Sequence, residues 1–110
     1  MAIFEQGDII RVNFDPTIGH EPQKSRPALV LSASDFNIRS SMTVVAPITS
    51  FYNGYPMHVP LSEDDDVTGC VCVEALRALD LDARSCELVG SASETAFNEV
   101  LNRVGAIFGI

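Results

Sequence analysis

Residues 26–32, RPALVLS, decide the fold that we expect for this chain. Residues 28–31 are apolar without interruption, which is typical of a β-strand that is covered on both faces. Pro27 cannot donate a backbone hydrogen bond, so we expect it at the first position of this strand. The residues before it, GHEPQK at positions 19–24, are polar and predict a loop. The stretch therefore predicts a buried strand with a charged loop at its mouth.

Further strands are predicted on both sides of this one. Residues 7–14, GDIIRVNF, and residues 42–49, MTVVAPIT, alternate in the period of two that marks a strand. Asn53-Gly54 is a turn sequence and a strong hairpin signal. Residues 57–61 and 67–74 supply two more short strands. Short strands at close spacing with one late helix indicate a mainly β fold, a small barrel or rolled sheet.

The late helix carries a capping box, with Ser91 as the expected N-cap and Glu94 three residues later. Its apolar residues fall on one face at helical spacing, and we expect this face to pack against the sheet. They are Phe97, Val100, Leu101, Val104, Ile107 and Phe108.

With 110 residues, the chain is expected to form a single domain over residues 1–110. It has no apolar segment of membrane-spanning length and no signal-peptide pattern at its start, so we expect a cytoplasmic protein. Cys70 and Cys72 point to one face of a strand. A metal-binding pair is one interpretation, but no second ligand pair stands at usable spacing, so we predict buried free thiols. We expect His58 to face outward.

The charge of the chain is unevenly distributed. The net charge is −8, of which residues 1–60 carry −1 and residues 61–110 carry −7. This acidity argues against broad, non-specific binding of nucleic acid, which depends on many Lys and Arg residues. It leaves room for a small basic site in the first half. The acidic run at residues 63–66 lacks the ligand spacing of a calcium loop, and we expect a solvated loop there.

Three residues at the mouth of the central strand could act together on a phosphodiester. Glu21 could serve as a general base, Arg26 offers a rigid positive fork for phosphate, and Thr49 adds a hydroxyl donor at a strand end. On spacing alone, a surface ion pair between Glu21 and Arg26 is the favoured interpretation.

Several stretches, taken in order along the chain, resemble the MazF/PemK family of toxin–antitoxin endoribonucleases, most closely its ChpB and PemK/Kid branch. Together with the closing helix, they cover more than two thirds of the chain. The stretches are GDIIRVNFDPTIGHE (7–21), RPALVLS (26–32), FN (36–37), MTVVAPIT (42–49), GYPMHVPL (54–61) and VTGCVCVEALRALDLDAR (67–84).

The resemblance implies a small SH3-like twisted β-barrel with a C-terminal helix, working as a homodimer with a cognate antitoxin as partner. It implies cleavage of single-stranded RNA without a metal or other cofactor. The ribose 2′-hydroxyl would attack the adjacent phosphate and leave a 2′,3′-cyclic phosphate and a 5′-hydroxyl. By the same resemblance, Glu21 takes the 2′-hydroxyl proton, Arg26 stabilises the phosphate and Thr49 holds a phosphate oxygen.

The resemblance and the loop position also suggest residues that contact RNA. These are His20, Gln23, Lys24 and Arg77, of which His20 is also a competing acid or base because it titrates near neutrality. Two residues depart from the family pattern. Pro22 after the loop acid favours an extended backbone at Glu21, and Ala75, where a Gln is common, bears on sequence preference because its side chain cannot hydrogen-bond to RNA bases.

Two alternatives come from different classes. The chain ends in Phe108-Gly109-Ile110, an echo of the end of the CcdB gyrase poisons, which share the fold and cleave nothing. A degenerate toxin that binds an antitoxin without cutting RNA is the other. An RNA cleavage assay separates these alternatives from a nuclease.

Overall fold

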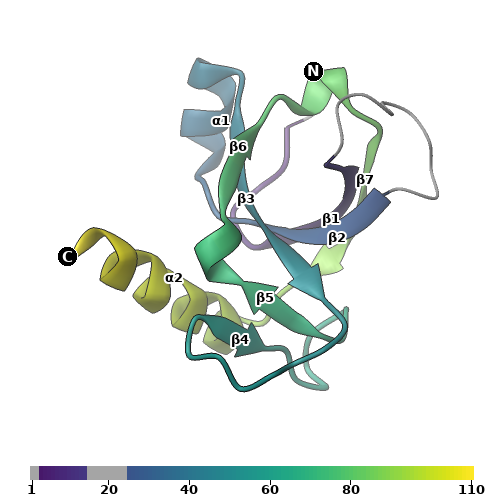
Figure 1. The fold of residues 1–110 in the computed structure, drawn as a ribbon. Coiled ribbons are helices and arrows are strands. Elements are labelled where there is room, and N and C mark those ends of the chain that lie inside the picture. The colour runs from purple at the N-terminus through teal and green to yellow at the C-terminus, as the bar shows by residue number, and fades with distance from the viewer. Residues whose placement is uncertain (1–2, 15–24) are drawn as a thin grey trace.

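The structure is a computed structural model that describes residues 3–14 and 25–110. In these residues, seven strands form one antiparallel sheet, accompanied by two α-helices and two short 3₁₀ turns (Figure 1). The strands are β1 Asp8–Asn13, β2 Ser25–Val30, β3 Thr43–Thr49, β4 His58–Pro60, β5 Cys70–Cys72, β6 Arg77–Leu79 and β7 Cys86–Ser91. The helices are α1 Ser34–Ser40 and α2 Glu94–Phe108, and the turns are η2 Val73–Ala75 and η3 Leu81–Ala83.

The sheet runs in the order β4-β5-β3-β2-β1-β7, and β6 pairs with β3 beside β5. The end strands of this path, β4 and β7, do not pair with each other within the described residues, so the sheet is open between them. The predicted mainly β fold with a C-terminal helix is confirmed. No helix in residues 3–14 and 25–110 is long and apolar enough to cross a membrane.

Strand β2 lies at the centre of the sheet and contributes to the core on both faces, as its uninterrupted apolar sequence predicts. Leu29 points into a cluster that Val100 of α2 covers, and Ala28 and Val30 point into a second cluster on the other face. All three β2 residues are fully buried. The two clusters explain why this strand needs apolar residues at successive positions.

Pro27 and Pro47 lie at positions in the sheet where no partner strand requires a backbone N–H donor. Pro27 is the third residue of β2 rather than the first, which corrects the sequence expectation. The N–H of Leu31 faces β3, where it donates to Val44, so by alternation the nitrogen of Pro27 also faces β3. The described β2–β3 pairing begins only at the next residue, Ala28. Pro27 therefore lies beyond the ladder on that side.

Pro47 marks the point where β3 changes partner. Residues Thr43 to Val45 pair with β6, whereas Ile48 and Thr49 pair with β5. By the same alternation the nitrogen of Pro47 points away from β2, toward the side of β3 on which β5 and β6 pair, and it lies in the gap between these two strands. One strand thus joins two smaller sheets.

Helix α1 was not predicted from the sequence, which indicated only one helix. It spans seven residues, and Asn37 is the residue that it buries. The Asn37 side-chain amide donates to the carbonyls of Phe4 and Ser32, each at 3.2 Å, and the Ser32 hydroxyl donates to Asn37 Oδ1. A buried polar residue, rather than an apolar stripe, holds this helix, so the period of 3.6 is not visible in its sequence.

Helix α2 is confirmed, but it begins two residues later than its predicted cap. Ser93 is the N-cap, and its Oγ accepts from the N–H of Ala96 at 3.2 Å; Ser91 lies in β7 instead. Val100 is fully buried, but the far end of the predicted packing face is not covered by the chain. Phe108 is 64% exposed, so packing on the sheet does not explain this residue.

The Asn53-Gly54 turn forms, but it does not join a hairpin. The Asn53 Oδ1 accepts from the N–H of Tyr55 at 3.0 Å, and Gly54 has a φ of 84°. The strand after this turn, β4, pairs with β5 and not with β3. Residues 50–57 therefore form a loop that passes over the edge of the sheet.

The acidic run at 63–66 is not a fully solvated loop, because two of its carboxylates hold other elements. Asp65 is buried, and its side chain accepts from the N–H of Ser93 at 2.6 Å and from the N–H of Ser62 at 2.7 Å. Asp66 accepts from the N–H of Ser91 at 2.9 Å. The run fastens its loop to β7 and to the start of α2.

Candidate active site

The sheet brings Arg26 and Thr49 together at the ends of two neighbouring strands. Ala28 lies opposite Pro47, and continuing this antiparallel register by two residues places Arg26 opposite Thr49. Both residues line one pocket of about 460 Å³. The described residues that line it are Arg11, Arg26, Pro27, Pro47, Ile48, Thr49, Ser50, Val67 and Thr68.

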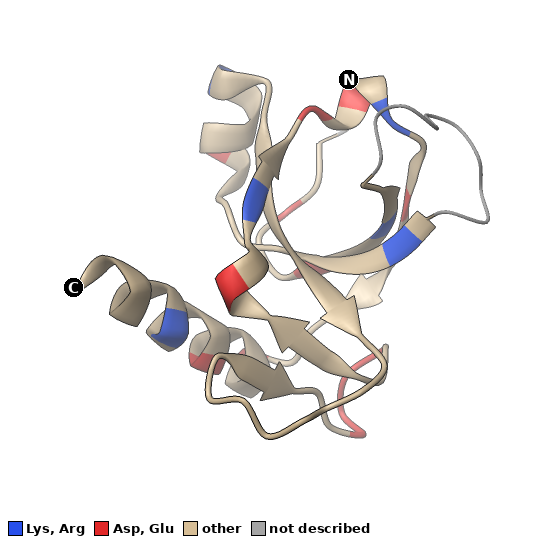
Figure 2. Ribbon diagram, in the orientation of Figure 1, with Lys and Arg blue, Asp and Glu red and all other residues tan. Residues whose placement is uncertain are grey.

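The pocket differs in charge from the rest of the chain. Its described lining holds two arginines and three hydroxyl side chains, and it contains no carboxylate, although the whole chain carries a net charge of −8. Figure 2 shows a basic residue at the start of β2, beside the end of β3. Guanidinium groups next to hydroxyl donors match the geometry and charge of a phosphate.

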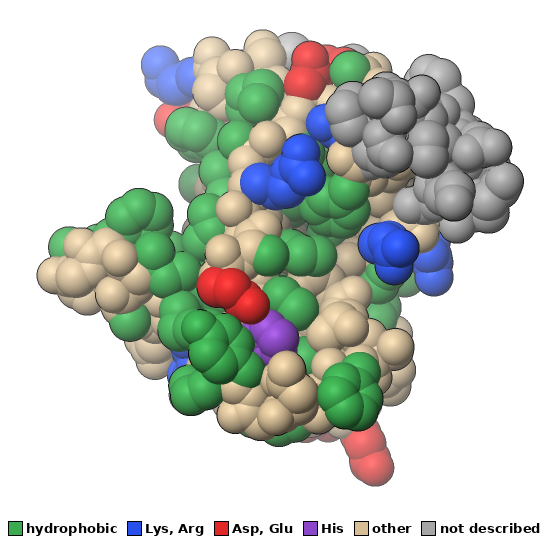
Figure 3. All heavy atoms as spheres, in the orientation of Figure 1, with side chains coloured by type: hydrophobic (Ala, Val, Ile, Leu, Met, Phe, Trp, Pro, Cys, Tyr) green, Lys and Arg blue, Asp and Glu red, His purple; other side chains and the backbone are tan. Residues whose placement is uncertain are grey.

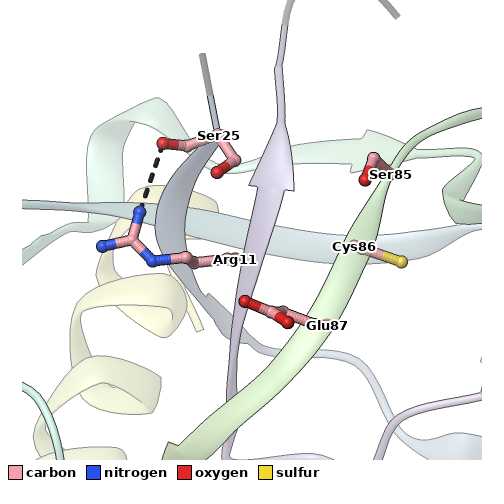
Figure 4. A pocket seen from close by; sticks show the side chains of 5 residues that line it. All are labelled: Arg11, Ser25, Ser85, Cys86 and Glu87. Carbon is pink, nitrogen blue, oxygen red and sulfur yellow. Dashed lines mark hydrogen bonds between the residues drawn. The ribbon is translucent and has the colours of Figure 1, made fainter. Parts of the chain in front are cut away.

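Arg11 is a site residue that the sequence analysis missed. It lies opposite Pro27 in the β1–β2 register, is exposed, and lines the pocket that Arg26 and Thr49 share. Its Nη1 donates to the backbone carbonyl of Ser25 at 3.3 Å (Figure 4). The alternation in residues 7–14 does not indicate this role, and only the folded structure shows that Arg11 and Arg26 line the same pocket.

Arg11 also borders a second pocket of about 270 Å³, whose other lining residues are Ser25, Ser85, Cys86 and Glu87. In Figure 4 the Glu87 carboxylate lies beside β1 while the Arg11 guanidinium is directed toward Ser25. The mixed charge of this second pocket suits an anion less well than the pocket of Arg26 and Thr49.

The backbone around Thr49 is held closely. Thr49 Oγ1 accepts from the N–H of Phe51 at 3.4 Å, which leaves the hydroxyl hydrogen able to donate to a ligand. Gly69 has a φ of 123°, and a Cβ at this position would lie 2.3 Å from the Thr49 carbonyl oxygen. The absence of a side chain at Gly69 lets the segment before β5 approach the end of β3.

The other predicted site residues are not among the described residues that line this pocket. Glu21, His20, Gln23 and Lys24 lie outside the described residues. Arg77 is in β6, and its guanidinium carbon is 5.7 Å from the centre of the Phe14 ring. Figures 2 and 3 show basic residues over β6 and at the start of β2 on the same face of the molecule, so Arg77 lies along the sheet from the pocket.

The prediction that His58 faces outward is wrong. Its side chain is 12% exposed, and its Nε2 lies 2.8 Å from Glu74 Oε2. Cys70 and Cys72 lie beside it as free thiols; Cys70 is buried, as predicted, whereas Cys72 is only half-buried. Burial raises the pKa of the Cys70 thiol, and burial together with the neighbouring Cys70 and Glu74 raises the pKa of Cys72.

The fold and the pocket define a class: a small antiparallel sheet with a terminal helix, in which arginine and threonine side chains line one pocket. The chain belongs to the family described as PemK-like, MazF-like toxin of type II toxin-antitoxin system, which it matches over residues 5–108. It is 45% identical to the Endoribonuclease toxin ChpB of Escherichia coli (strain K12), covering 94% of this chain and 93% of that protein. It is 35% identical to the Endoribonuclease PemK of Escherichia coli, over 94% and 80% of the two chains.

Solved structures agree with this assignment. The crystal structure of MazF (Form-I) from Deinococcus radiodurans has a TM-score of 0.86 and 33% identity, with 100% of both chains covered. The crystal structure of MazE-MazF (Form-II) from the same organism also has a TM-score of 0.86, with 29% identity and coverage of 100% of this chain and 99% of the other.

Proposed function

We propose that this chain is the toxin of a type II toxin–antitoxin pair and that it cleaves single-stranded messenger RNA in the cytoplasm. Its similarity to ChpB, PemK and MazF, each named an endoribonuclease, supports the activity. The observation that carries the proposal for this chain is the pocket where Arg26 and Thr49 meet. Two guanidinium groups line it, and its described lining has no carboxylate to repel a phosphodiester.

In the proposed reaction the RNA supplies its own nucleophile. Glu21 accepts the proton of the ribose 2′-hydroxyl, the 2′-oxygen attacks the adjacent phosphorus, and the bond to the 5′-oxygen breaks as this oxygen takes up a proton from water. The products are a 2′,3′-cyclic phosphate and a 5′-hydroxyl. Arg26 stabilises the charge on the phosphate oxygens, and Thr49 donates to one of them. This scheme uses no metal ion, because the guanidinium groups provide the positive charge.

Arg11 is proposed as a second cationic group on the same phosphate or on its neighbour. Its place opposite Pro27 brings its guanidinium to the pocket from β1, while Arg26 comes from β2. His20, Gln23, Lys24 and Arg77 are proposed to hold the flanking nucleotides. Arg77 suits this role because it is an exposed cation on the strand that pairs with β3.

A cognate antitoxin is the proposed protein partner, by likeness to the MazE-MazF structures. The pocket of Arg11 and Arg26 would receive carboxylates of the antitoxin, and apolar anchors would supply most of the affinity. We further propose that the active protein is a homodimer and that the single domain spans residues 1–110.

The test is cleavage of a long single-stranded RNA in EDTA, with the ends mapped. We expect Arg26→Ala to lose about 10²–10³-fold in rate, the usual cost of one donor to a charged transition state. Glu21→Gln should lose about 10²–10⁴-fold, as for a general base, and the loss should depend on pH. Thr49→Val should lose least, because it removes one neutral hydrogen bond. The products should carry the cyclic phosphate.

Arg39→Ala is the matched control, because Arg39 is an exposed arginine on α1 that pairs with Asp35 away from the pocket. It should cleave at the unchanged rate. Wild-type cleavage by Arg26→Ala, or a requirement for magnesium, would place the active site elsewhere. A well-folded chain that cuts no RNA would favour the gyrase-poison or degenerate-toxin alternative.

A further inference from the structure

A cluster of metal-ligand side chains lies outside the proposed cleavage pocket. In the antiparallel pairing of β4 and β5, His58 lies opposite Cys72, so their side chains share a face of the sheet. Cys70 is two residues before Cys72 and points to the same face. One ring nitrogen of His58 and the two sulfur atoms all lie within 4.8 Å of one another. Sequence spacing alone did not show the third ligand, because it comes from a different strand.

The hydrogen bonds of His58 prepare it for coordination. An ionised Glu74 can only accept, so His58 Nε2 donates to Glu74 Oε2, 2.8 Å away. In the neutral ring Nδ1 then carries a lone pair. Nδ1 is buried and has no hydrogen-bond partner among the described residues. A carboxylate that fixes one ring nitrogen while the other faces a ligand is the common outer-shell arrangement of metal-binding histidines.

We propose that His58, Cys70 and Cys72 bind one zinc-class transition-metal ion, with a water molecule as the fourth ligand. Two thiolates and an imidazole are the donors that zinc selects in proteins, and each thiol releases its proton to solvent on binding. A tetrahedral ion of this class holds such donors about 3.5–3.8 Å apart. The three side chains must therefore close by about 1 Å, a movement that side-chain rotation supplies.

The ion would act on the loop that follows the active-site threonine. The Cys70 sulfur donates to the Phe51 carbonyl at 3.5 Å, the Cys72 sulfur hydrogen-bonds the Thr49 backbone, and the Tyr55 ring packs edge-on against His58 at 5.2 Å. When the Cys70 thiol releases its proton to the metal site, its hydrogen bond to the Phe51 carbonyl is lost. The contact between Tyr55 and the metal-bound His58 would then link the loop of residues 50–57 to β4. This site is separate from the proposed cleavage chemistry, which uses no metal, so it goes beyond the proposed function.

The experiment is a titration of the reduced, metal-free protein with Co²⁺, followed by absorbance. We expect one ion per chain and a near-ultraviolet thiolate-to-cobalt charge-transfer band. Cys72→Ser and His58→Gln should each weaken binding at least tenfold, and Cys72→Ser should also reduce the band. Glu74→Gln should weaken binding by about 10–100-fold, the usual effect of losing an outer-shell partner.

The third cysteine provides the matched control. Cys86 is also a half-buried free thiol, but it lies on β7 beside Glu87 and outside the cluster. Cys86→Ser should bind Co²⁺ like the wild type. Circular dichroism of each variant shows whether it has folded, and the half-buried positions His58 and Cys72 are used because Cys70 is fully buried. The proposal is overturned by the lack of a charge-transfer band in excess Co²⁺ or by equal binding in all variants.

Discussion

Gly69 controls how closely the backbone can approach Thr49. We predict that Gly69→Ala lowers both the cleavage rate and the unfolding temperature. A methyl group there would lie 2.3 Å from the Thr49 carbonyl oxygen, and the φ of 123° is itself unfavourable for alanine. The strain costs about 1–3 kcal/mol, and the overlap adds about 1–3 kcal/mol.

Gly54→Ala separates these two effects. Gly54 also has a positive φ, 84°, but a Cβ there would meet no atom within 4 Å. Thermal unfolding and RNA cleavage of both variants check the prediction. We expect Gly54→Ala to show the smaller loss of stability and no change in rate, and equal behaviour of the two variants would contradict the packing argument.

At single residues, sequence and structure agree where the pattern was local. The apolar run of β2 and the strand-end position of Thr49 could be inferred from periodicity and turn residues, and the structure places Thr49 beside Arg26. Arg11 and His58 could not be inferred in the same way. Their neighbours come from other strands, so their surroundings depend on register, which a single sequence does not determine.

At the level of elements, Asp65 joins the loop before β5 to the start of α2. Burial alone would raise the pKa of Asp65, but hydrogen bonds from Ser93 and Ser62 outweigh it and hold the pKa below its ordinary value of 3.8. A carboxyl group whose pKa is lowered on folding stabilises the fold above its unfolded-state pKa. That contribution is lost as the pH falls through the lower, folded-state pKa.

We therefore predict that Asp65→Asn lowers the free energy of unfolding at neutral pH by about 1–3 kcal/mol, because a buried N–H loses its charged acceptor. The difference from wild type should shrink as the pH falls below about 4. Urea unfolding of both proteins, from neutral pH to below about pH 4, measures the difference in their free energies of unfolding. Asp64→Asn, an exposed neighbour, should change little, and a difference that persists unchanged at low pH would be inconsistent with the pKa argument.

The elements that the sequence did not predict share a physical cause. Helix α1 and strand β7 bury few apolar side chains: Asn37 is the buried residue of α1, and Leu88 in β7 is 59% exposed. Periodicity detects an element only when it covers a core. The cap of α2 moved from Ser91 to Ser93 because β1 pairs with β7 as far as Ser91, so strand pairing takes precedence over a local capping box.

At the scale of the whole molecule, apolar side chains remain exposed at the end of α2. Phe108 is 64% exposed, Ile107 43% and Leu101 37%. We predict that this end contributes to a homodimer interface, since exposed apolar patches of this kind commonly mark association surfaces. Phe108→Asp should lower the mass measured by light scattering toward that of one chain while leaving the fold intact.

Leu88→Asp is the control for this prediction. Leu88 is exposed to a similar degree, 59%, but lies on the edge strand β7. Its replacement should leave the mass unchanged. A wild-type mass equal to a single chain at micromolar concentration would contradict the dimer, and a shift only with Leu88→Asp would move the interface to β7.

The change of partner at Pro47 has a consequence for amide hydrogen exchange. Strand β3 links a larger unit, containing β1, β2, β6 and β7, to a smaller one that contains β4 and β5. Pro47 lies between the two parts of β3 and has no backbone N–H with which to form a hydrogen bond. Units joined in this way open separately, each with its own free energy. The amides of Ile48, Thr49 and β5 should therefore exchange together and faster than those of β1 and β2. Since Arg26 belongs to the larger unit and Thr49 to the smaller, a brief local opening would separate the two without unfolding the chain.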